Sequence, residues 1–238
     1  MSQASEARAA LIIPALNEEA AIGQTLKAVP RSLYRAIVVA DNGSTDRTAE
    51  IARAHGTTVV YEPERGYGAA CLRALAALPE EIDAVVFMDA DASDNPEEAA
   101  LLLAPIYDGR ADLVIGSRTL GEVEKGSLEP HQILGNRLAT FLVRLIYGHR
   151  YTDLGPFRAI RLEALKDLQL RDRNYGWTVE MQIRAVQHGL RVLEIPVSYR
   201  RRIGVSKVSG NLKASLRAGI KILWIVFRLA IARPATSR

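Results

Sequence analysis

Short apolar runs alternate with longer amphipathic stretches along the first half of the chain. Runs typical of strands buried on both faces of a sheet lie at 9–13, 36–40, 57–61, 85–88 and 112–116. The stretches after them have caps, early acids or terminal glycines that indicate helices, at 17–29, 47–55, 69–78 and from 96 onward. This alternation predicts an α/β fold: a mostly parallel, twisted sheet with helices on both faces and right-handed crossovers.

The pattern changes after residue 118. A charged loop at 119–129 precedes an expected helix at 131–147, a turn at 153–158, a helix that ends near 188 and a strand at 191–199. A last amphipathic helix is predicted from 211 to about 232. Length and apolar content suffice for one large domain with a peripheral helix, so we divide the chain into residues 1–210 and 211–238.

Composition excludes several classes of protein. The 238 residues include 31 Lys and Arg against 27 Asp and Glu, a net charge of +4 that does not indicate a nucleic-acid partner. The single cysteine, Cys71, excludes an internal disulfide and fits a small buried hydrophobe. We find no apolar signal-peptide core at the N-terminus and no run of ~18 apolar residues, so we expect a cytoplasmic protein.

Two aspartates end the apolar run at 85–88. Asp89 and Asp91 are separated by one residue, so in extended chain both carboxylates point to the same side. Two converging carboxylates repel each other unless a cation lies between them, and oxygen ligands suit Mg²⁺ or Mn²⁺. The alternative is structural, with Asp89 capping a turn and Asp91 beginning a loop.

Polar side chains also follow the other predicted strands. They are Asn17, Glu18, Asp41, Arg118 and the loop at 65–68. Open α/β sheets bind ligands at the carboxyl ends of their strands. We therefore expect these residues to join Asp89 and Asp91 in one concave site.

Several motifs, in this order, resemble glycosyltransferase family 2. They are PALNE at 14–18, DNGSTD at 41–46, GYGAA at 66–70 and DAD at 89–91. Three later segments, GSR at 116–118, YGWTVE at 175–180 and RxxGxSK at 201–207, resemble the dolichyl- or polyprenyl-phosphate mannose and glucose synthase branch. The similarity covers about residues 9 to 210.

The resemblance implies a nucleotide-sugar-binding fold of the GT-A type and an inverting, metal-dependent hexosyl transfer. The donor is then a UDP- or GDP-sugar, the cofactor Mg²⁺ or Mn²⁺ on Asp89 and Asp91, and the acceptor polyprenyl or dolichyl phosphate. The residues expected at the donor are Pro14, Leu16, Asn17, Glu18, Asp41, Gly43, Ser44, Arg65, Gly66, Gly68, Asp89 and Ala90. The candidate catalytic side chains are Asp91, Arg118, Asp153, Glu180, Arg201 and Lys207, of which Arg201 and Lys207 are expected to contact phosphate.

Two positions depart from the family pattern. Ser93, followed by Asp94, stands where the family often has Gln or His, which leaves the third protein ligand of the metal open. The turn at 153–158 differs from the usual Thr/Ser-Gly-Phe-Arg form, which leaves the sugar and the acceptor open.

The nature of the acceptor decides whether a base is required. A lipid phosphate is already an anion, and Arg118 would help to hold it. A hydroxyl acceptor requires a general base, for which Asp153 and Glu180 are the candidates. Structural alternatives are that Arg118 pairs with Asp153, that Glu180 pairs with Arg158, and that residues 200–202 form a solvated strand end.

The last predicted helix distinguishes the functional hypotheses. Its basic stripe is formed by Lys213, Arg217, Lys221 and Arg228, and an apolar stripe with Trp224 lies beside it. This pattern suits a membrane interface, or a helix that packs on the domain or joins copies in a homo-oligomer. Three hypotheses remain: a peripheral membrane transferase, a cytosolic transferase with a soluble acceptor, and a non-catalytic nucleotide-sugar-binding module.

Overall fold

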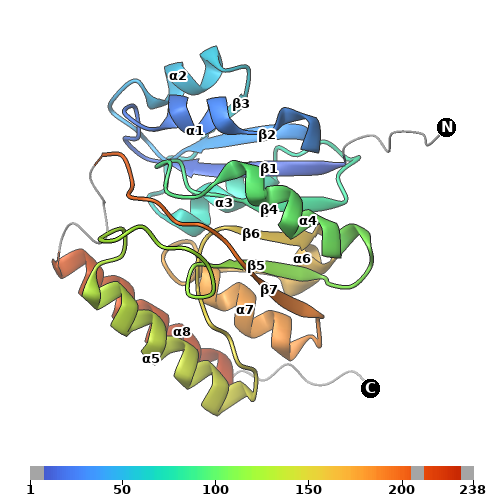
Figure 1. Ribbon diagram of the computed structural model, residues 1–238, viewed down its shortest axis with the longest axis vertical. Helices are drawn as coiled ribbons and strands as arrows, with labels where there is room; N and C mark the ends of the chain where they lie inside the picture. The colour runs from blue at the N-terminus through green and yellow to red at the C-terminus, as the bar shows by residue number, and fades with distance from the viewer. Residues whose placement is uncertain (1–7, 205–211, 232–238) are drawn as a thin grey trace.

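The computed structural model describes residues 8–204 and 212–231. One sheet contains β1 (Ala9–Ala15), β2 (Tyr34–Asp41), β3 (Thr58–Tyr61), β4 (Ala84–Phe87), β5 (Leu113–Ser117), β6 (Arg158–Arg161) and β7 (Val192–Pro196). Their order is β3-β2-β1-β4-β6-β5-β7, and β6 alone among them runs antiparallel to its neighbours (Figure 1). The predicted mostly parallel α/β fold is confirmed.

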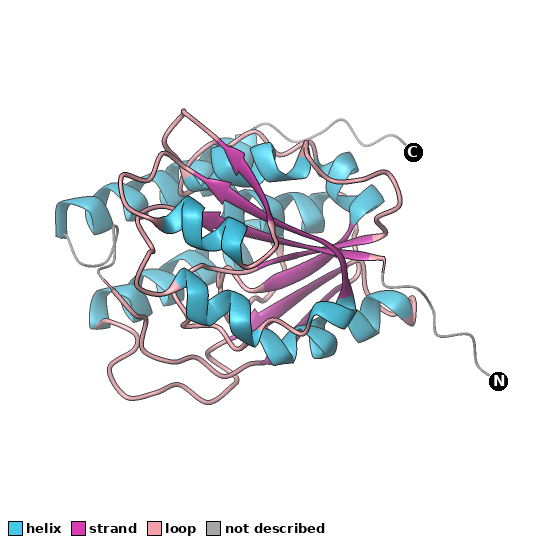
Figure 2. Cartoon of the chain, turned by 90° about the horizontal axis from the view of Figure 1, so that it is seen from above, coloured by secondary structure: helices cyan, strands magenta, loops and turns pink. Residues whose placement is uncertain are grey.

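Helices cover both faces of the sheet (Figure 2). α1 (Ile22–Ala28), α2 (Thr48–Ala54) and α4 (Ala99–Tyr107) pack on one face. α3 (Tyr67–Leu75), α5 (Pro130–Tyr147), α6 (Leu162–Leu168), α7 (Trp177–Gln187) and α8 (Leu212–Ile231) pack on the other. Alternate strand residues point to opposite faces, so Ile12 packs with the second group of helices and Leu11 with the first. Two short 3₁₀ helices, Arg31–Leu33 and Pro96–Glu98, complete the elements.

The first helix begins later than the sequence predicted. We expected it to open at residue 17, but α1 begins at Ile22. Asn17 has a left-handed backbone with φ of 52°, which a continuing α-helix does not accommodate. Residues 17–21 form a turn instead, and this turn brings Glu18 to the carboxyl edge of the sheet.

The segment after residue 153 contains a strand and a helix that the sequence did not predict. β6 lies in the middle of the sheet although it has an arginine at each end, Arg158 and Arg161. Arg158 is 1% exposed, and its guanidinium donates to the backbone oxygens of Gly155 and Thr178. A charged side chain that is hydrogen-bonded in this way can be buried. The strand therefore begins with a buried arginine, and a search for apolar runs did not indicate it.

Only one side of the last helix, α8, packs into the hydrophobic core. Ile225, Val226 and Leu229 of α8 are buried against α5 and α7. In the described ranges 8–204 and 212–231, no helix is both long and apolar enough to span a membrane.

Candidate active site

The carboxyl ends of three neighbouring parallel strands bring the predicted site residues together. Pro14 and Ala15 end β1, Asp41 ends β2, and Asp89 and Asp91 follow β4. Because β2, β1 and β4 are adjacent and parallel, these ends meet at one edge of the sheet.

A cavity of about 230 Å³ lies at this edge, which we call the carboxylate pocket. It is lined by Pro14, Ala15, Leu16, Glu18, Asn42, Arg65, Gly66, Tyr67, Ala70, Asp89, Ala90, Asp91, Asn174, Tyr175 and Arg202. Most of the residues expected at the donor are in this set. The others expected there, Asn17, Asp41, Gly43, Ser44 and Gly68, are outside it.

Asn17, Asp41 and Ser44 stabilise the loops beside the pocket. An Asp41 carboxylate oxygen accepts a hydrogen bond from the backbone N–H of Ser44 at 2.9 Å, and the Ser44 hydroxyl accepts from the N–H of Asn17 at 2.9 Å. The Thr48 hydroxyl accepts from the N–H of Glu18 at 2.8 Å. These bonds join the turn after β1 to the residues after β2 and hold the backbone of Glu18 in place.

Three aspartates gather at one side of the pocket. Asp91 and Asp94 are buried and Asp89 is half-buried. Burial, and then the charges of Asp91 and Asp94, raise the pKa of Asp89 well above its usual value. Burial and the charge of Asp91 raise the pKa of Asp94 to about 7. Burial and mutual repulsion therefore disfavour the ionised forms of Asp89 and Asp94.

The oxygen ligands at this side of the pocket fit a divalent cation. One oxygen of Asp94, Oδ1, is buried and has no hydrogen-bond partner among the described residues. The part of the chain that the structure describes contains no group of three or more His, Cys, Asp or Glu arranged as a metal site. Two carboxylates, from Asp89 and Asp91, match the way Mg²⁺ is held in enzymes that act on substrate phosphates, where waters and phosphate oxygens complete the coordination. Ser93, by contrast, donates its hydroxyl to Asp91 at 2.5 Å.

Arg202, and not Arg201, enters the pocket. The Arg202 guanidinium lies 2.8 Å from Glu18 and 3.2 Å from Asp91, and its Nε is buried without a hydrogen-bond partner among the described residues. Arg201 points outward, with 63% of its side chain exposed, and contacts Glu124 and the backbone oxygen of Lys125. Lys207 lies outside the described residues.

The segment that carries Arg202 crosses back over the carboxyl edge after β7 (Figure 1). The backbone N–H of Arg200 donates to the oxygen of Ser93, and that of Ile203 donates to the oxygen of Asp91, both at 2.9 Å. These bonds hold the segment against the loop of Asp91 and Ser93, where the Arg202 side chain reaches the carboxylates.

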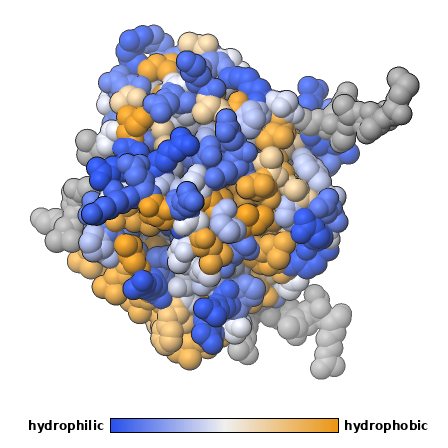
Figure 3. Space-filling view, in the orientation of Figure 1, coloured by the Kyte–Doolittle hydropathy of each residue, from blue (hydrophilic) through white to orange (hydrophobic). Residues whose placement is uncertain are grey.

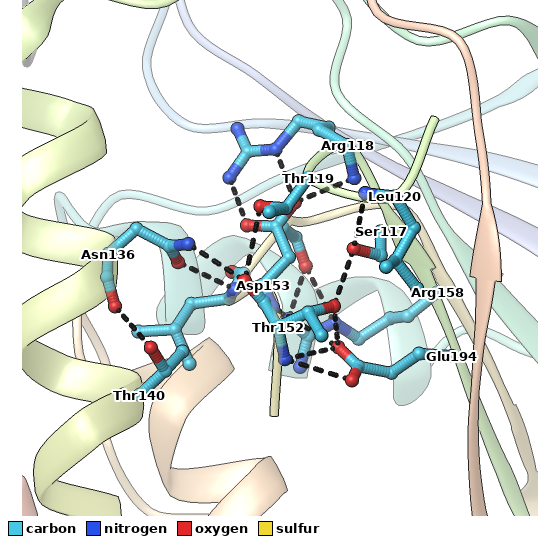
Figure 4. Close-up of polar contacts among 12 residues, drawn as sticks. Ser117, Arg118, Thr119, Leu120, Asn136, Thr140, Thr152, Asp153, Arg158 and Glu194 are labelled. Carbon is cyan, nitrogen blue, oxygen red and sulfur yellow. Dashed lines mark hydrogen bonds and ion pairs between the residues drawn. The ribbon is translucent and has the colours of Figure 1, made fainter. Parts of the chain in front are cut away.

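Arg118 and Asp153 form a buried ion pair at the end of β5 (Figure 4). Asp153 is 1% exposed, and both of its oxygens accept from the Arg118 guanidinium at 2.7 Å. Burial opposes the charge on Arg118, but the hydrogen bonds and charge of Asp153 outweigh it and raise the pKa of Arg118. The backbone around Asp153 is held in turn by Glu194, which accepts from the N–H groups of Thr152 and Asp153. The pairing of Arg118 with Asp153 is the structural alternative that the sequence left open.

A second cavity, of about 330 Å³, lies between this ion pair and the first turns of α5. We call it the Arg118 pocket. It is lined by Arg118, Thr119, Gly121, Val123, Glu124, Lys125, Gly126, Leu128, Gln132, Ile133, Asn136, Arg137, Thr152 and Asp153. Basic and apolar side chains thus share its walls.

Glu180 lies in neither pocket. It is fully buried on α7, where Oε2 accepts from the backbone N–H groups of Arg171 and Asp172 and Oε1 pairs with Arg184 at 2.9 Å. The structural alternative, in which Glu180 pairs with Arg158, is not observed, because the guanidinium of Arg158 is bonded to backbone oxygens instead. The structure does not bring Glu180 together with the aspartates.

Seven residues that line the carboxylate pocket were not among the site residues expected from the sequence: Ala15, Asn42, Tyr67, Ala70, Asn174, Tyr175 and Arg202. Asn42 sits inside the motif at 41–46, and its amide bonds Gly66 N–H and the oxygens of Glu62 and Glu64. Tyr175 begins the motif at 175–180, so both had a local signal. For Arg202 the signal was only its place in a basic run.

Comparison with known sequences gives the chain a family. Residues 10–169 match the profile of Glycosyl transferase family 2. The chain is 41% identical to an uncharacterized glycosyltransferase of Mycobacterium tuberculosis, over 87% of this chain and 93% of that protein. It is 35% identical to the dolichyl-phosphate hexose transferase of Haloferax volcanii, over 84% and 86%. It is 31% identical to the undecaprenyl-phosphate mannosyltransferase of Micrococcus luteus, over 86% and 89%.

Comparison with solved structures concerns the fold. The chain resembles glucosyl-3-phosphoglycerate synthase of Mycobacterium tuberculosis, solved in complex with Mn²⁺, uridine diphosphate and glucosyl-3-phosphoglycerate. The TM-score is 0.75 at 23% sequence identity, and the match covers 96% of this chain and 81% of that one. The GT-A fold expected from the sequence is confirmed.

Proposed function

The chain belongs to glycosyltransferase family 2, and we propose that it transfers a hexose from a UDP- or GDP-sugar to a polyprenyl phosphate at a membrane surface. Three carboxylates and one guanidinium, those of Asp89, Asp91, Asp94 and Arg202, meet beside a pocket at the carboxyl edge of the sheet. This arrangement above all supports a diphosphate donor.

We assign the carboxylate pocket to the donor. Asp89 and Asp91 would hold Mg²⁺ or Mn²⁺, which supplies positive charge to a leaving diphosphate. Arg202 lies against Asp91 and adds a fixed cation on the same side of the pocket. Glu18 orients that guanidinium from its other side, at 2.8 Å. The solved relative carries Mn²⁺ and uridine diphosphate, which agrees with this assignment.

We assign the Arg118 pocket to the acceptor phosphate. Its cations are Arg118, Lys125 and Arg137, and Val123, Leu128 and Ile133 supply apolar walls. A phosphate that bears an apolar chain requires both kinds of surface. The names of the Haloferax and Micrococcus relatives describe transfer to dolichyl and undecaprenyl phosphate.

The side chains of α5 and α8 support a membrane surface as the place of reaction. Exposed apolar side chains form one stripe on each helix: Ile133, Leu134, Leu138, Phe141 and Leu145 on α5, and Leu216, Ile220, Trp224, Phe227 and Ile231 on α8. We call these stripes the α5–α8 face. Hydrophobic surface lies over α5 in Figure 3. Neither helix contains an acidic residue, and Arg137, Arg144 and Arg217 are exposed on them, which suits anionic lipid.

The chemistry requires no general base. A phosphate oxygen of the acceptor attacks the anomeric carbon as the bond to the donor diphosphate breaks, and the electron pair of that bond leaves with the diphosphate. One displacement of this kind inverts the anomeric configuration. Asp153 is bonded to Arg118 through both oxygens, and Glu180 is fully buried, so neither is free to remove a proton.

A partition assay tests the proposal. The protein is incubated with Mn²⁺, a short polyprenyl phosphate and labelled UDP-glucose or GDP-mannose in turn, and the mixture is extracted with organic solvent. Label should enter the organic phase with one donor and should stay in water when the metal is chelated. Donor hydrolysis without label in the organic phase would instead identify a water-soluble acceptor and overturn the lipid assignment.

A further inference from the structure

A buried carboxylate shapes one wall of the carboxylate pocket. Oδ1 of Asp172 accepts hydrogen bonds from the backbone N–H groups of Asn174 at 2.9 Å and Gly176 at 3.0 Å. Asp172 is 5% exposed, so these bonds are shielded from water. Asn174, which is one of the two bonded positions, and Tyr175, which lies between them, line the pocket. The conformation of this wall therefore depends on Asp172.

The same turn packs against a second wall of the pocket. The backbone N–H of Ala69, in the first turn of α3, donates to the oxygen of Arg173 at 2.9 Å. A Cβ on Gly68 would come within 2.0 Å of the Asp172 backbone oxygen, so the two segments touch backbone to backbone. Tyr67, the residue before Gly68, lines the pocket. Any shift of the Asp172 turn is thus transmitted to α3.

The last helix holds this turn from outside the pocket. Nζ of Lys221 on α8 lies 2.8 Å from Oδ2 of Asp172, which is the carboxylate oxygen that the turn does not use. The side chain of Asp172 is 2% exposed and that of Lys221 is 35% exposed. Ile225, one turn further along α8, packs so closely on Gly176 that a Cβ there would meet it at 2.7 Å. One charge and one apolar contact therefore join α8 to the turn.

We propose that Lys221 is a positioning residue for the nucleotide donor, because it neutralises Asp172 and so fixes the turn that forms the pocket wall. This inference rests on the assignment of the carboxylate pocket to the donor. Lys221 lies on α8 and is not among the residues that line the pocket. Its removal leaves a buried carboxylate without its cation, and the turn relaxes to let water reach it.

The sequence left the role of this lysine open between a membrane surface and packing on the protein. Lys221 belongs to the basic stripe that suits a membrane surface, but in the structure it turns toward the protein. Arg228 of the same stripe also faces an acid, with 3.7 Å to Glu180. Arg217 is exposed and has no ion pair within the described ranges, so it provides a matched control on the same helix.

The test measures nucleotide affinity in the full-length protein by titration calorimetry. UDP and GDP, each with Mn²⁺, are titrated into the wild type and into Lys221→Met, Lys221→Arg, Arg217→Met and Asp91→Asn. We expect Lys221→Met to weaken binding of the nucleotide that the wild type binds by about five- to tenfold. Lys221→Arg should restore affinity to within about threefold, because it keeps the charge, and Arg217→Met should bind as the wild type does.

The variants separate failure of this inference from failure of the proposed function. If the wild type binds neither nucleotide, or if Asp91→Asn binds as tightly as the wild type, the donor assignment is wrong and the inference falls with it. If Asp91→Asn loses binding while Lys221→Met keeps wild-type affinity, only the role of Lys221 is overturned. An equal loss in Arg217→Met or in Lys221→Arg overturns it as well. Melting temperatures of the same samples ensure that folded proteins are compared.

Discussion

The carboxylate pocket and the α5–α8 face differ in what they present to a ligand. The pocket is lined by backbone turns and by carboxylates whose positions are fixed by hydrogen bonds, such as that from the Ser93 hydroxyl to Asp91. The α5–α8 face instead exposes long apolar side chains, among them Leu145 at 70% and Leu134 at 69%. The first surface suits a small polar ligand of fixed shape, and the second suits a fluid apolar partner.

The two regions meet at the Arg118 pocket. Arg118 stacks on the ring of Tyr199, with 5.0 Å to the ring centroid, and the backbone of Tyr199 pairs with Asp94 of the aspartate group. On its other side the pocket reaches Ile133 and Arg137 in the first turns of α5. A donor in one region and a lipid chain on the other would therefore meet near Arg118. The following substitutions test whether the carboxylate pocket and the α5–α8 face act separately, beginning with the largest expected effect.

Asp91→Asn should abolish most transfer. Asp91 is buried and supplies one of the two carboxylates that we assign to the metal. Loss of its charge should lower kcat/KM by about 10³-fold, or about 4 kcal/mol of transition-state stabilisation. Asp108→Asn, in an exposed ion pair at the end of α4, should change kcat/KM by less than about twofold. Activity of Asp91→Asn above about a tenth of the wild type would contradict the assignment.

The sequence predicted the donor side better than the acceptor side, for a physical reason. Asp89 and Asp91 follow an uninterrupted apolar run, and their spacing alone places both carboxylates on one side. The Arg118 pocket depends on residues far apart in the chain, such as Asn136, whose amide oxygen accepts from the N–H of Leu154. No local pattern encodes that contact. β6 was missed for a related reason, because its buried Arg158 is satisfied by the backbone oxygens of Gly155 and Thr178, which no apolar pattern indicates.

Arg118→Met should destabilise the fold more than it disturbs the donor. It leaves Asp153, which is 1% exposed, as a buried charge without its partner. We expect a loss of about 3 kcal/mol in the free energy of unfolding, measured with denaturant. In Arg118→Met/Asp153→Asn the loss should be smaller than the sum of the single losses, because the two groups interact directly. Additive losses would show that the pair contributes nothing through its own contact.

Arg202→Met and Arg201→Met test which arginine serves the donor. Arg202 lies between Glu18 and Asp91, whereas Arg201 contacts Glu124 at the surface. We expect Arg202→Met to lower kcat/KM by about 10²-fold, or about 2.7 kcal/mol, and Arg201→Met to change it by less than about threefold. The reverse order would restore the role that the sequence motif at 201–207 implied for Arg201.

Leu145→Asp addresses the α5–α8 face alone. Leu145 is 70% exposed on α5, so a charge there should cost little in stability but should oppose insertion into lipid. We expect about tenfold weaker sedimentation with anionic vesicles and the same affinity for nucleotide. Leu101→Asp provides the control, because Leu101 is 52% exposed on α4, which packs on the opposite face of the sheet. If both variants bind vesicles as the wild type does, the apolar stripes do not contact the membrane, and packing between copies of the chain becomes the better explanation for their exposure. If Leu145→Asp alone loses vesicle binding while its nucleotide affinity is unchanged, the donor site and the membrane surface act separately. The difference between fixed polar groups in the pocket and exposed apolar side chains on the α5–α8 face implies this result.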